Sequence, residues 1–190
     1  NLKVARDHDW GTAYPSSDKS VSVSKAGSIL TITLNGTTVI TKVEAPVAKI
    51  GAVNYMDLQS AIDAAVDGDI ILVAPGTYAP ITVGKGITIK GETGNFNDVI
   101  IDANNASRCI QVSHTNAVIS SLTVTRGHVP TKGDRQGVGI RLSNGGIVTN
   151  CHITSCNIKS GPSYSEYTLG GGMYNVNGYV VDCVFDKCSA

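Results

Sequence analysis

Apolar and polar residues alternate in the N-terminal part of the chain. From Val21 to Val43, Val, Ile and Leu alternate with Ser and Thr, and Asn35-Gly36 interrupts the alternation. An Asn-Gly pair between two alternating runs indicates a hairpin, because both central residues of a type I′ turn need a positive φ. The pattern predicts a small antiparallel meander over residues 20–45. Residues 1–19 show no clear period and are expected to be irregular, with at most one short strand.

A single helix is predicted after Pro46, where the meander ends. The apolar positions that follow Asp57 recur with the helical period and are Leu58, Ala61, Ile62, Ala65 and Val66. The Asp57 carboxylate can accept hydrogen bonds from the first free N–H groups of a helix, and Asp67-Gly68 is a sequence at which helices end. We therefore expect one helix between these two points.

Beyond Gly68 the chain consists of very short apolar runs separated by turns that contain glycine. Three later segments superpose on one another, namely residues 109–124, 139–153 and 172–185. Two sets of residues coincide in this superposition, at steps of 29 and 32 residues: Leu122, Cys151 and Cys183, and Val124, Ile153 and Phe185. A unit that repeats at this length is typical of a parallel β-helix, in which each repeat is one coil. We expect Ile153 and Phe185 to be buried between coils.

Two further features of the repeats fit a solenoid. Ser121, Asn150 and Asp182 share the position just before the inward residue, where short polar side chains that tolerate left-handed geometry suit a tight bend. Inserts of variable length, such as 127–137 and 160–170, separate the repeats, and such inserts are expected to be loops that project from stacked coils.

We predict an all-β chain: a right-handed parallel β-helix with an N-terminal capping helix, preceded by a small antiparallel β meander. The irregular segment and meander occupy residues 1–45, and the helix and first coils occupy residues 46–190. The helix is expected to cover the first coil, whose edge would otherwise recruit another strand. Because the sequence ends within a coil, we expect a solenoid truncated at its C-terminus, with an uncapped last coil available for self-association.

The run from Leu58 to Asp69, with Ala74-Pro75-Gly76-Thr77-Tyr78 after it, resembles the N-terminal cap and first coil of pectin-lyase-like right-handed β-helix proteins. The later Gly-Gly-Ile-Val-Thr-Asn-Cys and Gly-Gly-Gly-Met-Tyr segments are similar to repeats of bacterial surface β-helix proteins. The resemblance covers residues 47–190 and implies a secreted or cell-surface location, in a bacterium. It does not fix an activity, because this superfamily contains polysaccharide lyases, glycoside hydrolases and adhesins alike.

Composition removes two classes of partner. The chain has 15 basic and 15 acidic residues and no run of Lys or Arg, so it lacks the charge pattern of a nucleic-acid-binding protein. Its apolar runs, such as Ile70 to Val73, are far shorter than the roughly 20 residues that a membrane-spanning helix needs. We expect neither nucleic-acid binding nor a membrane span.

The cysteines allow three interpretations. Cys151 and Cys156 repeat one coil later as Cys183 and Cys188, so each is expected to stack on its counterpart. Buried, unpaired thiols are the favoured interpretation; a disulfide between stacked cysteines is an alternative, and a four-cysteine zinc site is disfavoured by the repeat spacing. Cys109 leaves an odd count and is expected to be buried and free.

Charged and aromatic residues of the inserts are the candidate site residues. A lyase that acts on uronic acids needs a cation or Ca²⁺ to neutralise the carboxylate, and a base to remove a proton. The candidate catalytic residues are Arg126, His128, Arg135 and His152. The candidate binding residues are Lys132, Asp134, Lys159, Tyr164, Glu166 and Tyr167. The favoured interpretation is that these are ordinary solvated loop residues.

No cluster of carboxylates with Ca²⁺-ligand spacing is evident, so no metal site is predicted, and Ca²⁺ would be expected as a cofactor only of a lyase. Three functions remain open. The first is a structural, adhesive or glycan-contacting segment of an extracellular protein without catalysis, for which polysaccharide is the expected partner. The second is the N-terminal part of a polysaccharide lyase or glycoside hydrolase. The third is a self-associating structural unit.

Overall fold

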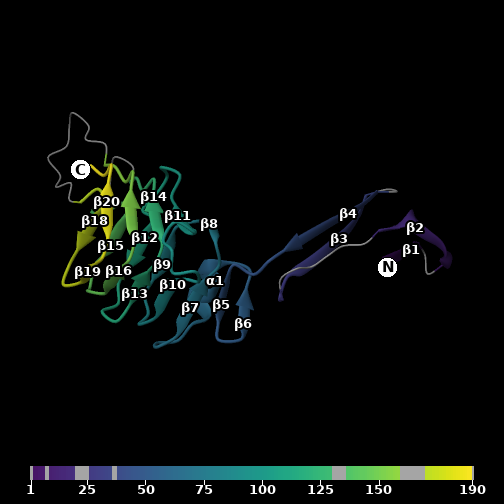
Figure 1. Ribbon diagram of the computed structural model, residues 1–190, viewed down its shortest axis with the longest axis horizontal. Helices are drawn as coiled ribbons and strands as arrows, with labels where there is room; N and C mark the ends of the chain where they lie inside the picture. Colours follow the sequence, from purple (N-terminus) through teal and green to yellow (C-terminus); the bar gives the residue numbers. More distant parts are fainter. Residues whose placement is uncertain are drawn as a thin grey trace. The chain divides into compact units, whose positions relative to one another are not determined.

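The structure is a computed structural model with two compact units, Asn1–Pro46 and Val47–Ala190 (Figure 1). The residues that it describes are 2–6, 9–19, 26–35, 38–129, 136–158 and 170–189.

The first unit consists of two antiparallel strand pairs. Strands β1 (Leu2–Arg6) and β2 (Asp9–Lys19) form one pair, and β3 (Ile29–Asn35) and β4 (Thr38–Glu44) form the other. The second pair confirms the predicted hairpin. Asn35 pairs with Thr38 and is therefore the last residue of β3, whereas the sequence placed it in the turn. The expectation that residues 1–19 are irregular is wrong, because β1 and β2 pair there with an irregular register.

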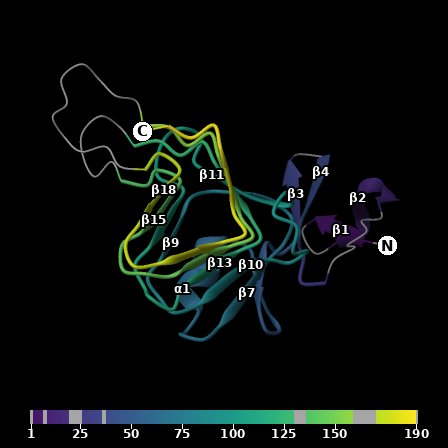
Figure 2. The same ribbon diagram turned by 60° about the vertical axis from the view of Figure 1, so that its left-hand side comes forward.

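The second unit is a parallel β-solenoid with three sheets, one on each face of the coil (Figure 2). The first sheet contains β5 (Ala48–Ile50), β6 (Val53–Tyr55), β7 (Ile70–Val73), β10 (Thr88–Gly91), β13 (Val118–Ser120), β16 (Ile147–Thr149) and β19 (Tyr179–Val181). The second sheet contains β8 (Gly76–Tyr78), β11 (Val99–Asp102), β14 (Thr123–Thr125), β17 (His152–Thr154) and β20 (Val184–Asp186). The third sheet contains β9 (Ile81–Val83), β12 (Ile110–Val112), β15 (Ile140–Leu142) and β18 (Met173–Asn175).

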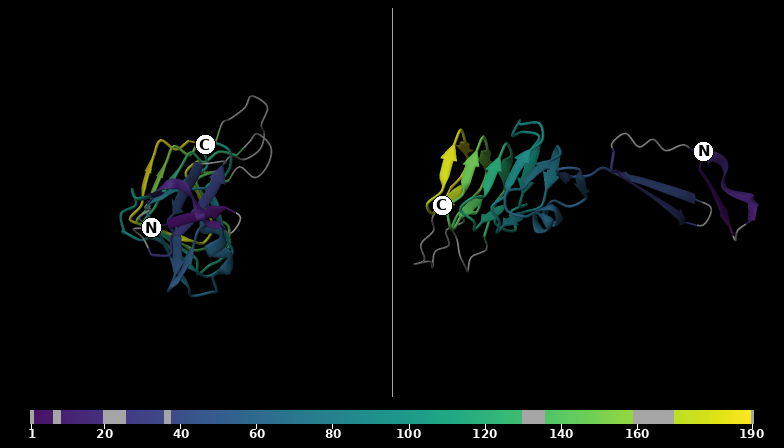
Figure 3. Two further views of the ribbon diagram at one scale, coloured as in Figure 1. Left: turned by 90° about the vertical axis from the view of Figure 1, so that its right-hand side faces the viewer. Right: turned by 90° about the horizontal axis from the view of Figure 1, so that it is seen from below.

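Successive coils stack in register, as Figure 3 shows from below. In the second sheet Ile101 pairs with Val124, Val124 with Ile153, and Ile153 with Phe185. The first three of these side chains are fully buried. The repeat alignment predicted from the sequence is therefore confirmed. Phe185 is 45% exposed, so the expectation that it is buried like Ile153 is wrong: no described strand packs on the far side of β20.

The short polar residues that share one repeat position lie at the bend between the first and second sheets. Ser121, Asn150 and Asp182 have φ values of 58°, 49° and 51°, the left-handed region that short polar residues tolerate. The Asn150 side-chain amide donates to the Ser121 hydroxyl (3.1 Å), one coil away. This confirms the predicted role of the three positions.

Helix α1 (Leu58–Ala64) closes the first coil, as predicted. Asp57 is its N-cap and accepts from the backbone N–H of Ser60 at 2.7 Å. The helix buries Leu58, Ala61 and Ile62 in the core of the solenoid. It ends earlier than expected, so that Val66 lies outside it and is 66% exposed.

A short hairpin, missed in the sequence, also protects this end. Strand β5 pairs antiparallel with β7, and β6 pairs with β5. At the neighbouring face the Gln59 side chain takes the place of a strand: its amide nitrogen donates to the Thr82 carbonyl and its oxygen accepts from the Thr82 N–H. The edges of β7 and β9 are thereby satisfied.

The connections between sheets differ in how their lengths change along the solenoid. The link from the second sheet to the third lengthens with every coil, from two residues (79–80) to seven (103–109), fourteen (126–139) and eighteen (155–172). The links from the third sheet back to the first stay between three and five residues. Insertions therefore concentrate at one corner of the coil.

Candidate functional site

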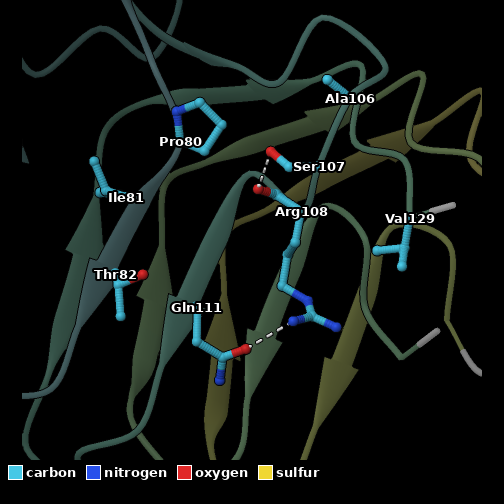
Figure 4. A pocket seen from close by; sticks show the side chains of 8 residues that line it. All are labelled: Pro80, Ile81, Thr82, Ala106, Ser107, Arg108, Gln111 and Val129. Carbon is cyan, nitrogen blue, oxygen red and sulfur yellow. Dashed lines mark hydrogen bonds between the residues drawn. The ribbon is translucent and has the colours of Figure 1, made fainter. Parts of the chain in front are cut away.

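An open hollow of about 490 Å³ lies beside the third sheet, at the corner where the long connections emerge (Figure 4). Its lining combines apolar and hydrogen-bonding side chains and consists of Pro80, Ile81, Thr82, Ala106, Ser107, Arg108, Gln111 and Val129. The residues come from three coils, so the hollow depends on correct stacking of the solenoid.

The outer face of the third sheet carries one polar or aromatic side chain per coil. Thr82 pairs with Gln111, Gln111 with Arg141, and Arg141 with Tyr174. Each residue stands in the middle of its strand, and in the first three coils its two neighbours in the strand are buried apolar residues. Because side chains alternate along a strand, the middle residues point away from the core. We call Thr82, Gln111, Arg141 and Tyr174 the outer column.

Arg108 lies beside this column and is held in place by several hydrogen bonds. Its Nη1 donates to Gln111 Oε1 (2.9 Å), its Nε to the Gly137 carbonyl (3.0 Å) and its Nη2 to the Gln136 carbonyl (2.9 Å). Burial, and then the charge of Arg141, lower the pKa of Arg108. A guanidinium group nevertheless remains protonated at neutral pH. Arg108 and Arg141 therefore present two positive charges on neighbouring coils, near enough to influence each other.

The next coil continues the same surface. The Arg141 guanidinium lies over the ring of Tyr174, 5.9 Å from its centroid, which is the geometry of a cation–π contact. The Gln111 amide nitrogen donates to the Ser143 hydroxyl at 3.3 Å. Within the outer column Arg141 thus contacts Tyr174, while Gln111 is held by Arg108 and Ser143 beside it.

Such a surface can recognise an elongated, hydroxylated and carboxylated ligand. Guanidinium groups bind carboxylates with paired, charge-assisted hydrogen bonds, and Gln and Thr side chains exchange hydrogen bonds with hydroxyl groups. Pro80 and Val129 offer apolar contact at the rim of the hollow. The equal spacing of coils, about 4.8 Å, repeats the contact along the solenoid axis.

Two of the candidate catalytic residues, Arg126 directly after β14 and His152 in β17, each contact a carboxylate. Arg126 binds the Asp102 carboxylate with its Nε (2.8 Å) and Nη2. His152 Nε2 lies 2.8 Å from Asp186 Oδ1, and its ring meets Phe96 edge to face. Neither Arg126 nor His152 lines the hollow.

His128 is the described candidate that lies beside the hollow. Its backbone N–H donates to the Ser107 carbonyl, and the next residue, Val129, lines the hollow. Its imidazole Nδ1 lies 3.1 Å from the Asn157 carbonyl. The three described candidates therefore have different partners: Asp102 for Arg126, Asp186 for His152 and the Asn157 carbonyl for His128.

The other predicted site residues lie outside the described residues. They are Arg135, Lys132, Asp134, Lys159, Tyr164, Glu166 and Tyr167. They belong to the fourteen- and eighteen-residue connections, 126–139 and 155–172, which leave the solenoid at the corner of the hollow.

The five cysteines carry free thiols, and four of them stack as predicted. Cys151 lies next to Cys183, and Cys156 lies next to Cys188. Cys109 is buried as expected, but its thiol also contacts that of Cys156, which the sequence did not indicate. Within the described ranges, no three His, Cys, Asp or Glu side chains are arranged to hold a metal ion.

The outer column was not predicted from the sequence, although three of its four residues align in the repeats. Gln111, Arg141 and Tyr174 occupy equivalent positions in the three superposed segments, between two inward residues. Their chemical types differ, so only the shared register links them.

Comparisons with protein-family models, with curated proteins and with solved structures found no match to this chain. Among the described residues there is no helix with the length and apolar character needed to cross a membrane.

Proposed function

We propose that this chain is part of a pectin-lyase-like β-helix protein of the extracellular space or cell surface, and that its outer column binds an acidic polysaccharide. The solenoid with a helix over its first coil supports the superfamily. The run from Leu58 to Tyr78, which carries the resemblance, forms that helix and the first two strands of the coil.

The observation that carries the binding proposal is the register of the outer column beside the hollow. Thr82, Gln111, Arg141 and Tyr174 follow one another on four adjacent strands of one sheet. A polymer laid along the solenoid axis would meet one of these side chains on every coil. A small ligand would gain little from such a repeated arrangement, whereas each added sugar of a polymer gains a contact.

Charge favours an acidic polymer over a neutral one. Arg108 and Arg141 lie on neighbouring coils and are close enough for the charge of one to lower the pKa of the other. A carboxylate between two guanidinium groups relieves their repulsion and accepts hydrogen bonds from a fixed, planar donor set. Uronic-acid polymers supply carboxylates at regular intervals, together with ring hydroxyls for Gln111 and Thr82.

The position of the long connections agrees with this proposal. Binding residues of solenoids and barrels are found disproportionately on loops that a rigid scaffold positions. Connections 126–139 and 155–172 leave the coil at the corner of the hollow. The predicted binding residues Lys132, Lys159 and Tyr164 belong to them, and we propose that they contribute further contacts to the same polymer.

The test is affinity electrophoresis of the 190-residue chain in gels that contain polygalacturonate, alginate or neutral dextran. We expect retardation by the acidic polymers and none by dextran. The substitution Arg141→Gln removes one charge of the column, and we expect it to weaken binding about tenfold, the loss typical of one charge-assisted contact. Retention should fall as salt rises, since charge carries part of the affinity.

The matched control is Lys90→Gln, which removes one positive charge from β10, an exposed position of the first sheet. Binding should be unchanged in this variant. Equal loss in both variants would mean that net charge rather than the outer column governs retention. Absence of retardation by every acidic polymer would overturn the proposal.

Incubation of the chain with the same acidic polymers in solution tests the lyase alternative. A lyase leaves an unsaturated product, which absorbs ultraviolet light, and Ca²⁺ is added to half of the samples. Product that is lost in His128→Ala but kept in His152→Ala would place catalysis beside the hollow. Binding without product would favour an adhesive or structural role.

A second candidate function is self-association through the last coil. Five large apolar side chains on β19 and β20 are 39% to 71% exposed, namely Tyr179, Val180, Val181, Val184 and Phe185. Among the described residues no strand pairs with the outer edge of either strand. The other end of the solenoid is covered by α1 and the β5–β6 hairpin, so a second copy would dock tail to tail, about a twofold axis that buries the same surface on both.

Sedimentation velocity over a hundredfold range of protein concentration tests this candidate. We expect a concentration-dependent dimer that Val181→Lys abolishes, because a charge on an edge strand opposes pairing. Val53→Lys is the matched control, since Val53 is 56% exposed on β6 at the opposite end. A monomer at every concentration would exclude this function for the chain.

A further inference from the structure

The cysteines of the last two coils form two separate columns. Cys151 and Cys183 immediately precede β17 and β20, and the pairing of His152 with Val184 places them in register. Cys156 and Cys188 follow the same strands, and Cys156 also contacts Cys109. The first column is therefore an isolated pair, whereas the second is a row of three thiols.

The geometry of the first pair suits a covalent bond. Neighbouring strands of a sheet lie about 4.8 Å apart, and disulfides join residues whose Cα atoms are about 4.4 to 6.8 Å apart. The two thiols lie close enough for each to shift the pKa of the other. Each also donates to the carbonyl two residues earlier, Thr149 for Cys151 and Val181 for Cys183, both at 3.2 Å. Both side chains thus make the same backbone contact on neighbouring strands, whose general spacing suits a disulfide.

The two thiols differ in access and in acidity. Cys151 is fully buried, whereas Cys183 is partly exposed. The hydrogen bond from Cys151 lowers the pKa of Cys183 to about 7, while the neighbouring charge of Asp182 opposes this effect. The same hydrogen bond and burial raise the pKa of Cys151. The outer cysteine is thus both the more accessible and the more acidic of the two thiols.

We propose that Cys183 and Cys151 are a thiol–disulfide exchange site, in which Cys183 attacks a disulfide compound and Cys151 resolves the product into a bond between the two coils. In the first step the Cys183 sulfur bonds to one sulfur of the compound and releases the other as a thiolate. In the second step Cys151 gives its proton to that thiolate and attacks the Cys183 sulfur, which expels the second thiol. The two cysteines lose two electrons and two protons, and one disulfide becomes two thiols.

The bond would link strands β17 and β20 through the bend that precedes them. It closes a loop from residue 151 to residue 183, which contains the eighteen-residue connection 155–172. Closing a long loop restricts the unfolded chain and raises stability. The last coil has no described strand on its far side, so it gains most from being fastened to its neighbour.

The second column provides an internal comparison. Cys188 is partly exposed, like Cys183, but the hydrogen bond with Cys156 and burial raise its pKa. A protonated thiol is a poor nucleophile, because the thiolate is the reactive form. Exposure alone would make Cys183 and Cys188 equally reactive, and the arrangement of the columns favours Cys183.

The experiment is incubation of the reduced 190-residue chain with glutathione disulfide, followed by intact mass and peptide mapping. We expect the wild type to lose two hydrogen atoms and to yield one crosslinked peptide that contains Cys151 and Cys183. Cys151→Ser should stop after the first step and retain one glutathione on Cys183. Cys183→Ser should yield neither product at Cys151, and the control Cys188→Ser should behave as the wild type. The rate of the first step should rise steeply between about pH 6 and pH 8, as the thiolate fraction of Cys183 grows.

Cys151→Ala gives a second version of the resolving variant that adds no polar atom to the core. The crosslinked chain should also unfold at a higher urea concentration than the reduced chain. A first adduct on Cys188, a crosslink between Cys156 and Cys188 in place of the predicted one, or a crosslink that forms only in denaturant would each overturn the proposal.

Discussion

Arg126 binds Asp102 across two adjacent coils, with Nε and Nη2 directed at the two oxygens of one carboxylate. The residues are 24 positions apart in sequence: Asp102 is the last residue of β11, and Arg126 directly follows β14. The hydrogen bond from Arg126 is the main cause of a lowered pKa at Asp102. Arg126, a candidate catalytic residue in the sequence, therefore joins two coils.

The stability of the solenoid should depend on pH through this pair. The folded-state pKa of Asp102 is below its unfolded value of about 3.9, so the contribution is complete above that pH and disappears as the pH falls through the folded value. Urea midpoints of the wild type and Asp102→Asn should differ at pH 7 and converge as the pH falls through the folded-state pKa of Asp102. The control is Asp98→Asn, whose carboxylate accepts a long hydrogen bond of 3.4 Å from Asn95. A difference that persists in acid would contradict the assignment.

Ile153 and Phe185 occupy the same repeat position but differ in burial. Burial, rather than repeat position, should decide how much stability an introduced charge costs. Ile153 is fully buried, and Ile153→Asp places an unpaired carboxylate in the core at a cost of about 4 kcal/mol or more. Phe185 occupies the same column but is 45% exposed, so Phe185→Asp should cost about 1–2 kcal/mol. Chemical denaturation of both variants provides the comparison. Equal losses would mean that the last coil is covered in solution.

Gly91 is required by a close approach of two coils. A Cβ at this position would lie 2.2 Å from the carbonyl oxygen of Ser121, a backbone atom that cannot turn away. We expect Gly91→Ala to destabilise the fold by about 2 kcal/mol or more through overpacking. Gly84→Ala is the matched control, because the nearest atom to its Cβ would be Ser113 Oγ at 3.7 Å. Thermal melts that rank the two variants in the opposite order would contradict this account.

The N-cap of α1 should contribute measurably to closing the first coil. Asp57 accepts from the N–H of Ser60 (2.7 Å) and from its hydroxyl (2.9 Å). Asp57→Ala removes both bonds and should cost about 1 kcal/mol, whereas Asp57→Asn keeps an acceptor and should cost less. The difference can be read from urea midpoints. Hydrogen exchange of β7 and β9 should also accelerate in Asp57→Ala, because the helix packs against both strands.

Much of the solenoid could be predicted because each coil repeats the same ladder. The coincidence of Val124 with Ile153, and of Leu122 with Cys151, is a property of sequence spacing that pairing preserves. The β5–β6 hairpin could not be predicted, because its strands, Ala48–Ile50 and Val53–Tyr55, are too short for a period to show. Phe185 was misjudged since register says which way a side chain points but not whether another coil covers it.

The candidate site was harder to predict than the fold. Charged residues of the inserts were chosen for their chemistry, but chemistry alone did not reveal that Arg126 faces Asp102 or that His152 faces Asp186. The outer column was missed for the opposite reason, because Gln111 and Arg141 share a position without sharing a chemical type. In a solenoid, side chains contact residues of the adjacent coil. Those contacts can be identified only once the pairing register between the coils is known.

The connection between the second and third sheets grows from two residues to eighteen while the strands that it joins keep their pairing. The entropy of closing a loop rises only with the logarithm of its length, by about 0.6 kcal/mol for each doubling. The whole increase therefore costs about 2 kcal/mol, which a few buried side chains offset. Longer connections at this corner therefore cost the solenoid little stability, and their length can change while the coils remain superposable.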